Sequence, residues 1–381
     1  MPLTPPLPTT IQGSMPHELV SLSEEVWMKS AKLSSIYSPH VLNSIKELLR
    51  KVNSYYSNRL ESEGTHPVDI ERAMRKDFDI DEKKRNLQQL SLAYIETQTQ
   101  IEKQCKKKSF EPFSKEFTLW VHETLYSKKE MNIFCNIPTN QEGTSSVIMT
   151  PGKLREDDVA VGNHTAPLHQ ELSSLFATYE SFYNKDFTKL TQAHKLIYAI
   201  MAHHKLTWLH PFLDGNGRVG RMIIPLFLKQ TGLIQRPMFY ISAFFEANRE
   251  EYYDRLLAVS RDGNWTGWCA FFLKAVRMQA EQNFQKAQAV LDLYNQMKLT
   301  IAEISHSQFS IHVLDWIFEH PIFNGASFSN ASGIPKATAI RMLRVLREEN
   351  ILKLLEKAKG NKSAIYGYVN LLNIVEGYHV L

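Results

Sequence analysis

The sequence predicts a mainly α-helical protein with more than one domain. Its 381 residues exceed the length of an average single domain. Apolar residues recur at three- and four-residue intervals over most of the chain, which indicates amphipathic helices. These patterns divide the chain into an N-terminal helical region (residues 1–109), a mainly helical core (residues 110–285) and a C-terminal domain (residues 300–381).

The N-terminal region begins with a Pro- and Thr-rich stretch over residues 1–20, for which we expect irregular structure. Helical patterns follow over about residues 24–59 and 67–101, and the turn signal "SEGTHP" separates them. The basic run at residues 106–108 is typical of a solvated face or a loop rather than of a binding patch.

The core contains one interruption of its helical pattern, at residues 142–167. There the β-branched stretches "SSVIM" and "VAV" flank a Pro-Gly turn, and together they predict a small β-hairpin. Helical patterns resume at about Leu168 and continue to about Ser305. In "YAIMAHHKLTWL", adjacent helical residues point about 100° apart, so we expect one of His203 and His204 to be buried and the other exposed, not a metal-binding pair.

The C-terminal domain has a pattern of its own. The stretch "SNASGIPKATAIRMLRVLREENIL" predicts a short helix, a glycine turn and a second helix with Ala339, Met342, Leu343 and Leu346 facing inward. The next stretch, "KLLEKAKGNKSAIYGYV", predicts two short strands around a Gly-Asn-Lys tip. A helix-turn-helix followed by a two-stranded wing is typical of a winged-helix domain.

Composition excludes several classes of protein. The net charge of +4 permits phosphate or nucleic-acid binding without arguing for it. Cys105, Cys135 and Cys269 are far apart, which predicts neither a disulfide framework nor a zinc site. The N-terminus lacks the pattern of a signal peptide, and no apolar stretch reaches the roughly 18 residues that span a bilayer. We therefore expect a cytoplasmic protein with no membrane partner.

The most informative stretch is "HPFLDGNGRVGR", residues 210–221. Its glycines leave backbone N–H groups uncovered where a helix opens, and such a helix N-terminus attracts anions. Arg218 and Arg221 are three positions apart, so their guanidinium groups can converge on one anion. Because an arginine fork fits phosphate oxygens bidentately, we expect a polyphosphate here.

The acid and the base of this stretch fit the same ligand. Asp214 next to a polyphosphate is a suitable ligand for Mg²⁺, which prefers one or two protein carboxylates with phosphate oxygens and water. The imidazole of His210 is suited to take a proton from an attacking hydroxyl. Phe212 between them is expected to face the core. The alternative is a glycine-rich turn with a satisfied histidine and surface arginines, but the ordered set of residues favours a functional site.

This stretch resembles the signature HxFx(D/E)GNGRxxR of the Fic family at every specified position. The preceding "REDDVAVGNHTAP" resembles the Fic flap, and "REEYYDRLLAVSRDGNWTGWCAFFL" resembles the helices that follow the motif in that family. The resemblance covers about residues 110–280 and implies a Fic-type helical core with a β-hairpin flap.

The resemblance implies a protein adenylyltransferase, which transfers AMP from ATP to a Ser, Thr or Tyr hydroxyl of a target protein. His210 would be the catalytic base, and Asp214 would hold Mg²⁺. Nucleotide contacts are implied for Gly215, Asn216, Gly217, Arg218, Val219, Gly220 and Arg221, and for Tyr252 and Tyr253 near the base, where core packing is the alternative. The flap residues Val159, Ala160, Val161 and Gly162 would pair with an extended target segment. Transfer of phosphocholine, UMP or the γ-phosphate is a related alternative.

The N-terminal stretch "YSNRLESEG" resembles the Fic inhibitory motif (S/T)xxxE(G/N), with Ser57 and Glu61 at the matching spacing. It departs from the motif at Ser62, and the glycine follows two residues late. Glu61 would pair with Arg221 and occupy the position of the γ-phosphate, which predicts autoinhibition. Alternatively, the stretch is an ordinary helix end, or the glutamate positions a water molecule that removes AMP.

A different class of function follows from the winged helix, which would make the protein a DNA-binding or docking regulator with a vestigial Fic site. The basic residues that could meet DNA phosphates are Lys336, Arg341, Arg344, Arg347, Lys359 and Lys362. Glu348, Glu349 and Glu356 nearby argue against DNA. Self-modification and a homodimer are compatible with the enzyme interpretation.

Overall fold

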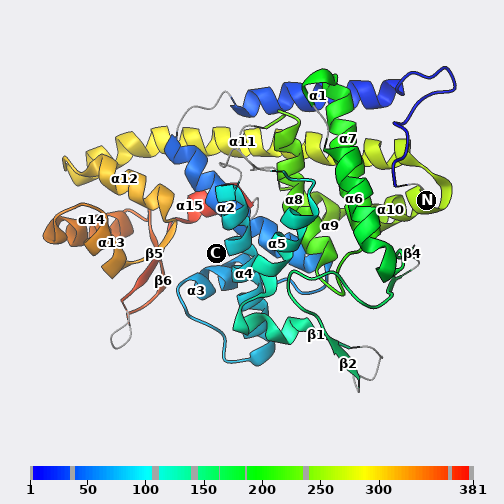
Figure 1. The fold of residues 1–381 in the computed structure, drawn as a ribbon. Coiled ribbons are helices and arrows are strands. Elements are labelled where there is room, and N and C mark those ends of the chain that lie inside the picture. The colour runs from blue at the N-terminus through cyan, green and yellow to red at the C-terminus, as the bar shows by residue number, and fades with distance from the viewer. Residues whose placement is uncertain are drawn as a thin grey trace. The chain divides into compact units, whose positions relative to one another are not determined.

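The computed structural model describes residues 3–34, 39–104, 111–138, 145–162, 164–184, 187–234, 240–358 and 363–376. This part of the chain is mostly helical, with a few short antiparallel strands, as expected from the sequence (Figure 1). It forms two compact units, one of Met1–Ala31 and Arg50–Ala280, the other of Lys32–Leu49 and Glu281–Leu381. The division into three regions stays a prediction. Within the described ranges, no helix combines the length and apolar character that crossing a bilayer requires.

The described part of the N-terminal region is mainly helical. Its helices are α1 (His17–Ser34), α2 (Pro39–Leu60), α3 (Pro67–Met74) and α4 (Glu82–Gln104). The helical pattern over residues 24–59 thus belongs to two helices, and α2 begins at a proline, which suits a first helical turn. The turn signal at residues 62–67 follows the end of α2 at Leu60, and His66 caps α3 by accepting a hydrogen bond from the N–H of Val68.

The strands of the core pair differently from the sequence prediction. The elements here are α5 (Lys115–Tyr126), η1 (Lys129–Cys135), β1 (Asn136–Pro138), β2 (Ser146–Ile148), β3 (Ala160–Val161) and β4 (His164–Thr165). The stretch "SSVIM" pairs with β1, and "VAV" pairs with β4, so the two do not form one hairpin. The Pro-Gly turn therefore does not connect two paired strands; its Gly152 adopts a left-handed conformation (φ 74°) and donates its N–H to His122.

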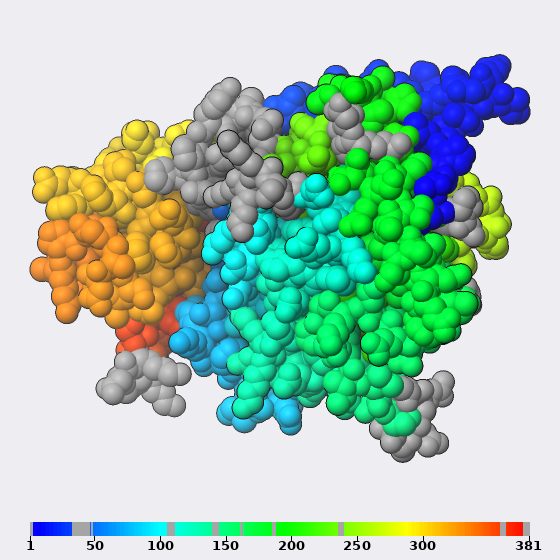
Figure 2. Space-filling view, in the orientation of Figure 1, coloured from blue at the N-terminus to red at the C-terminus, as the bar shows by residue number. Residues whose placement is uncertain are grey.

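The remaining core is helical. Its elements are η2 (His169–Glu171), α6 (Leu172–Tyr183), η3 (Phe187–Lys189), α7 (Gln192–Leu209), α8 (Asn216–Gln230), α9 (Ser242–Ala247), α10 (Arg249–Asp262) and α11 (Trp265–Ser305). Helix α7 packs against both α6 and α8 (Figure 1). In Figure 2, the cyan and green segments from α5 to α6 share one face of this unit.

The expectation that one of two adjacent histidines is exposed was wrong. His203 and His204 are both buried, since α7 is covered on several sides. The ring of His203 stacks on Trp268 with centroids 6.2 Å apart, and that of His204 meets Trp265 at 4.9 Å. Helix α7 is therefore the central helix on which the following turn is built.

The C-terminal end of the second unit contains the expected two helices, α13 (Gly325–Ala331) and α14 (Lys336–Glu348), followed by the two expected strands, β6 (Lys353–Glu356) and β7 (Ile365–Gly367). Three further elements were not predicted: α12 (Ser310–Glu319), β5 (Ile322–Asn324) and α15 (Val369–Glu376). The strands form one antiparallel sheet in the order β5-β7-β6. All four residues of α14 expected to face inward are buried. The wing tip, with Lys359 and Lys362, lies outside the described residues, as do Cys105 and the basic run at 106–108.

Candidate active site

The turn between α7 and α8 carries most of the predicted site residues. His210 ends α7 in a left-handed conformation (φ 46°, ψ 60°), and Gly215 precedes α8 with φ 79°. The side chain of Asn216 fastens the turn, because its amide donates to the carbonyl of Phe212 and accepts from the N–H of Phe212, both at 2.9 Å. The side chain of Asn216 is thus committed to the loop, and what it can offer an anion is its backbone.

His122 of α5 contacts this turn through Asp214 and Phe212, and it was not predicted from the sequence. Its Nδ1 accepts the N–H of Gly152 at 2.9 Å, so its Nε2 carries the proton and donates to the carbonyl of Asp214 at 3.3 Å. Burial lowers the pKa of His122 to about 4, which keeps the ring neutral. Its ring stacks on the buried ring of Phe212, with centroids 3.8 Å apart. The expectation that Phe212 faces the core is confirmed.

A cavity of about 460 Å³ opens beside His210. It is bordered by Gly162 of the flap, Gly217 and Arg221 of α8, and Tyr253 of α10. Burial lowers the pKa of His210 to about 4, and the neighbouring His164 and Arg155 act in the same direction. The imidazole is therefore neutral at ordinary pH and able to accept a proton.

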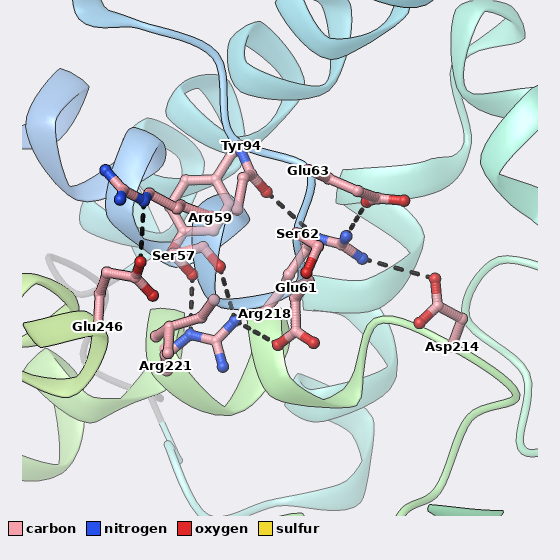
Figure 3. A network of polar contacts seen from close by, with 12 residues as sticks. Ser57, Arg59, Glu61, Ser62, Glu63, Tyr94, Asp214, Arg218, Arg221 and Glu246 are labelled. Atoms are coloured by element: carbon pink, nitrogen blue, oxygen red, sulfur yellow. Dashed lines mark hydrogen bonds and ion pairs between the residues drawn. The ribbon is translucent and has the colours of Figure 1, made fainter. Parts of the chain in front are cut away.

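Arg221 points to the end of α2 (Figure 3). Its Nε donates to the hydroxyl of Ser57 at 2.9 Å, and its Nη2 donates to the carbonyl of Ser57 at 2.9 Å and to Oε1 of Glu61 at 2.6 Å. These residues are 160 or more positions apart in the sequence. The structure thus brings together Ser57, Glu61 and Arg221, as the inhibitory motif implies.

The carboxylate of Glu61 lies against the N-terminal end of α8. A Cβ added at Gly217 would lie only 2.3 Å from Oε1 of Glu61, so only a glycine leaves room for the carboxylate in this position. Burial would raise the pKa of Glu61, but Arg221 and Arg218 together hold it below the usual value. An ionised carboxylate therefore occupies the anion-attracting end of the helix.

Arg218 has a separate carboxylate partner, Glu63, which sequence analysis missed (Figure 3). The buried guanidinium of Arg218 also donates to Tyr126 Oη at 2.8 Å and to Asn58 Oδ1 at 3.1 Å, and it lies 3.5 Å from Asp214 Oδ2. Burial raises the pKa of Glu63 in spite of Arg218, and the nearby charges of Asp214 and Glu61 raise it further. The only sequence signal for Glu63 was an acidic residue two positions after the expected glutamate.

Val219 and Gly220, two of the predicted nucleotide-binding residues, contribute to the packing of α8 in this structure. The N–H of Val219 bonds to the carbonyl of Gly215 at 2.9 Å, and its side chain is buried. A Cβ at Gly220 would lie 3.2 Å from Thr207 Cγ2, so this glycine permits close contact of α7 and α8. The cavity is not lined by either residue.

The predicted tyrosines differ from each other. Both line the cavity, but Tyr252 is only 2% exposed and its ring stacks on Phe245 at 4.4 Å, whereas Tyr253 is 44% exposed. In the flap, Ala160 and Gly162 are exposed. Among the described strands, β3 pairs only with β4, so its other edge offers backbone groups to an extended segment.

The residues present fit a magnesium ion that arrives with a nucleotide. The side chain of Asp214 is 44% exposed, and Mg²⁺ needs only one or two protein carboxylates when phosphate oxygens and water complete its shell. Within the described ranges, no three His, Cys, Asp or Glu side chains are grouped so as to hold a metal by themselves. Asp214 would thus be the ligand that the protein itself supplies.

The site thus consists of a glycine-rich turn that leads into the buried helix α8 and carries two arginines, Arg218 and Arg221. This combination in a helical fold indicates a particular class of protein. Residues 112–228 match the model of the Fic/DOC family. The chain therefore contains a region that matches the Fic/DOC family.

Curated relatives match part of the chain. The protein adenylyltransferase Fic of Culex quinquefasciatus is 36% identical over 113 residues, and that of Aedes aegypti is 37% identical over 113 residues. Each match covers 30% of this chain and 21% of the relative. The chain thus matches about a fifth of the length of these relatives.

Solved structures share the fold at low sequence identity. A Fic family protein from Desulfovibrio desulfuricans G20 has a TM-score of 0.54 at 15% identity, covering 96% of this chain and 98% of that chain. Fic-1 from C. elegans (residues 134–508) has a TM-score of 0.54 at 15% identity, covering 72% of this chain and 73% of that chain.

Proposed function

We propose that this chain is a protein adenylyltransferase, which transfers AMP from ATP to a Ser, Thr or Tyr hydroxyl of a protein. The observation that carries the proposal is the position of His210, whose neutral imidazole borders the same cavity as Gly217 and Arg221. The names of the curated relatives agree with it. Self-modification, a homodimer and a cytoplasmic location stay predictions.

The residues divide the reaction between them. His210 would take the proton from the target hydroxyl as its oxygen bonds to the α-phosphorus of ATP. The bond from the α-phosphorus to the bridging oxygen would break, and pyrophosphate would leave with the negative charge. Arg221 and the N–H groups at the start of α8 would hold the oxygens on which that charge develops. Mg²⁺ on Asp214 would add positive charge next to the same phosphates.

The flap would bind the target protein and present its hydroxyl group. An extended target segment would add to the outer edge of β3 (Ala160–Val161) by main-chain hydrogen bonds. Backbone pairing selects for an extended conformation more than for particular side chains. The hydroxyl presented in this way would have to reach the imidazole of His210.

We further propose that the described conformation is autoinhibited. Both arginines that would hold the phosphates are already paired with carboxylates, Arg221 with Glu61 and Arg218 with Glu63. An ATP molecule in a productive pose must displace these carboxylates from the arginines. Glu61 also lies close enough to His210 to affect its pKa, and it would orient water if the enzyme also removes AMP.

The test is incubation of the Glu61→Gly chain with ATP labelled at either the α- or the γ-phosphate. Protein labelling from α-labelled ATP alone supports AMP transfer, and labelling from γ-labelled ATP alone would show kinase chemistry instead. The same chain with His210→Ala in addition should bind ATP but transfer nothing. Label from neither substrate would contradict the proposal.

DNA binding by the C-terminal domain stays a prediction. In α14, Arg344 pairs with Glu348 at 3.9 Å, and Arg341 donates to the carbonyl of Ser305 at 3.2 Å. These contacts occupy two of the basic side chains that would meet phosphates. A gel shift that is sensitive to salt and to Arg344→Ala would support DNA binding.

A further inference from the structure

Arg155 forms hydrogen bonds both to the turn that begins at His210 and to the flap, residues 157–167. It lies in the segment that leads into β3, and its side chain is fully buried. Its Nε donates to the carbonyl of His210 at 2.8 Å, and its backbone N–H donates to the carbonyl of Pro211 at 2.9 Å. One residue thus binds two consecutive peptide groups at the point where α7 ends.

The rest of the same guanidinium holds both ends of the flap. Its Nη1 donates to the carbonyl of Asp157 at 2.7 Å, and its Nη2 donates to the carbonyl of Pro167 at 2.5 Å. Asp157 precedes β3 and Pro167 follows β4, so the two contacts enclose the whole hairpin. The flap and His210 are therefore fastened to one rigid, planar group.

An ordinary role in stability does not account for this arrangement well. A buried guanidinium is costly to desolvate, and its nearest carboxylate, Asp158, lies 3.7 Å away with a half-exposed side chain. Three carbonyls that point at one planar fork satisfy the charge with fixed geometry. One of them belongs to His210, whose left-handed conformation is unfavourable for a residue with a side chain and needs such support.

We propose that Arg155 is a positioning residue that fixes the register between the target-docking flap and the imidazole of His210. The inference rests on the proposed adenylyltransferase activity. In this role Arg155 contacts neither ATP nor the reacting hydroxyl. It ensures that a hydroxyl presented on β3 arrives within reach of the base.

The kinetic test compares Arg155→Lys with the unaltered residue in the Glu61→Gly chain, using self-labelling from α-labelled ATP. Lysine keeps the charge but cannot bond three divergent carbonyls. We expect kcat to fall by about 10²-fold, as for a small misplacement of reacting groups, while the KM for ATP stays within about twofold. Arg261→Lys is the control, because Arg261 is 67% exposed and pairs with Asp262. If Glu61→Gly labels itself and Arg155→Lys labels equally well, the inference is wrong although the proposed function holds.

A second measurement does not depend on activity. Hydrogen exchange in Arg155→Lys should rise together in the flap (residues 157–167) and in residues 210–212, with other segments unchanged. In the ¹⁵N-labelled wild-type chain, the Nε–H of Arg155 should exchange slowly with solvent, which requires no variant to fold. Rapid exchange of this proton, or a rise confined to one of the two segments, would overturn the inference. Failure of all labelling with normal exchange changes would instead reject the proposed function alone.

Discussion

Glu63 forms an ion pair with Arg218, 155 residues further along the chain. Together with the pair of Glu61 and Arg221, it places two carboxylates from one short segment on both arginines of the α8 turn. The altered end of the inhibitory motif, where serine follows Glu61, is thus accompanied by a second acidic contact. If both carboxylates oppose ATP, their removal should have separate and cumulative effects.

We therefore predict that Glu63→Gln increases ATP affinity by about fivefold, the equivalent of about 1 kcal/mol for a partly exposed ion pair. Glu61→Gly should increase it more, because Glu61 lies against Gly217 as well as Arg221. The double variant should exceed both in ATP affinity and in self-labelling. Calorimetric titration with ATP and Mg²⁺ measures the affinities, with the exposed Glu130→Gln as control. Equal affinity of Glu63→Gln and wild type would show that Arg218 is not blocked by Glu63.

The rate of transfer should show little dependence on pH above about pH 5. Burial lowers the pKa of His210 to about 4, with His164 and Arg155 acting in the same direction and Glu61 opposing them. A base must be neutral to act, so activity rises with pH through this pKa and is flat above it. Glu61→Gly removes the opposing negative charge, which should shift the acid limb lower still.

The measurement is kcat/KM of the Glu61→Gly chain between about pH 4.5 and pH 8, since this quantity reports the free enzyme. Circular dichroism at each pH controls for unfolding. An acid limb near the ordinary histidine value of about 6.5 would mean that the base is more exposed than its position in the structure indicates.

Acid should destabilise the fold through the buried histidines of α7. Burial lowers the pKa of both His203 and His204 to about 3. As pH falls below about 6.5, the unfolded chain binds protons that the folded chain cannot, so the free energy of unfolding decreases down to the folded-state pKa. Each such histidine contributes a slope of about 1.4 kcal/mol per pH unit. Urea unfolding of His203→Gln at pH 7 and pH 5 should show a smaller loss than wild type, whereas the exposed His17→Gln should match wild type.

The sequence predicted what depends on neighbouring residues and missed what depends on distant ones. The turn from His210 to Arg221 was readable because its glycines, acid, base and arginines lie within one stretch. The inward face of α14 followed from its periodicity in the same way. The predicted pairing of "SSVIM" with "VAV" was wrong because the actual partner of "SSVIM", β1, contains a proline and has no strand pattern of its own.

Contacts across the fold left no comparable signal. Glu63 reaches Arg218 only because the end of α2 is brought to the start of α8, and Arg155 reaches His210 only because the flap returns to the end of α7. His203 and His204 are both buried because α7 is surrounded by other helices, which the angle between two side chains cannot reveal. The residues to which we assign the chemistry were therefore visible in the sequence, while Glu63 and Arg155, which contact them from distant segments, were not.

Substitution of Tyr252 should mainly affect the stability of the fold, and substitution of Tyr253 should mainly affect nucleotide binding. Tyr252 is 2% exposed and stacks on Phe245, so Tyr252→Ala should lower the free energy of unfolding by about 3–5 kcal/mol, as for other large aromatic truncations. Tyr253 is 44% exposed at the cavity, where it could stack on a nucleotide base. In the Glu61→Gly chain, Tyr253→Ala should therefore weaken ATP binding by about tenfold, in line with about 1–3 kcal/mol for base stacking, and leave stability nearly unchanged. Urea unfolding and ATP titration of both variants measure the two effects. If Tyr253→Ala binds ATP as tightly as its parent, the base does not lie on this side of the cavity.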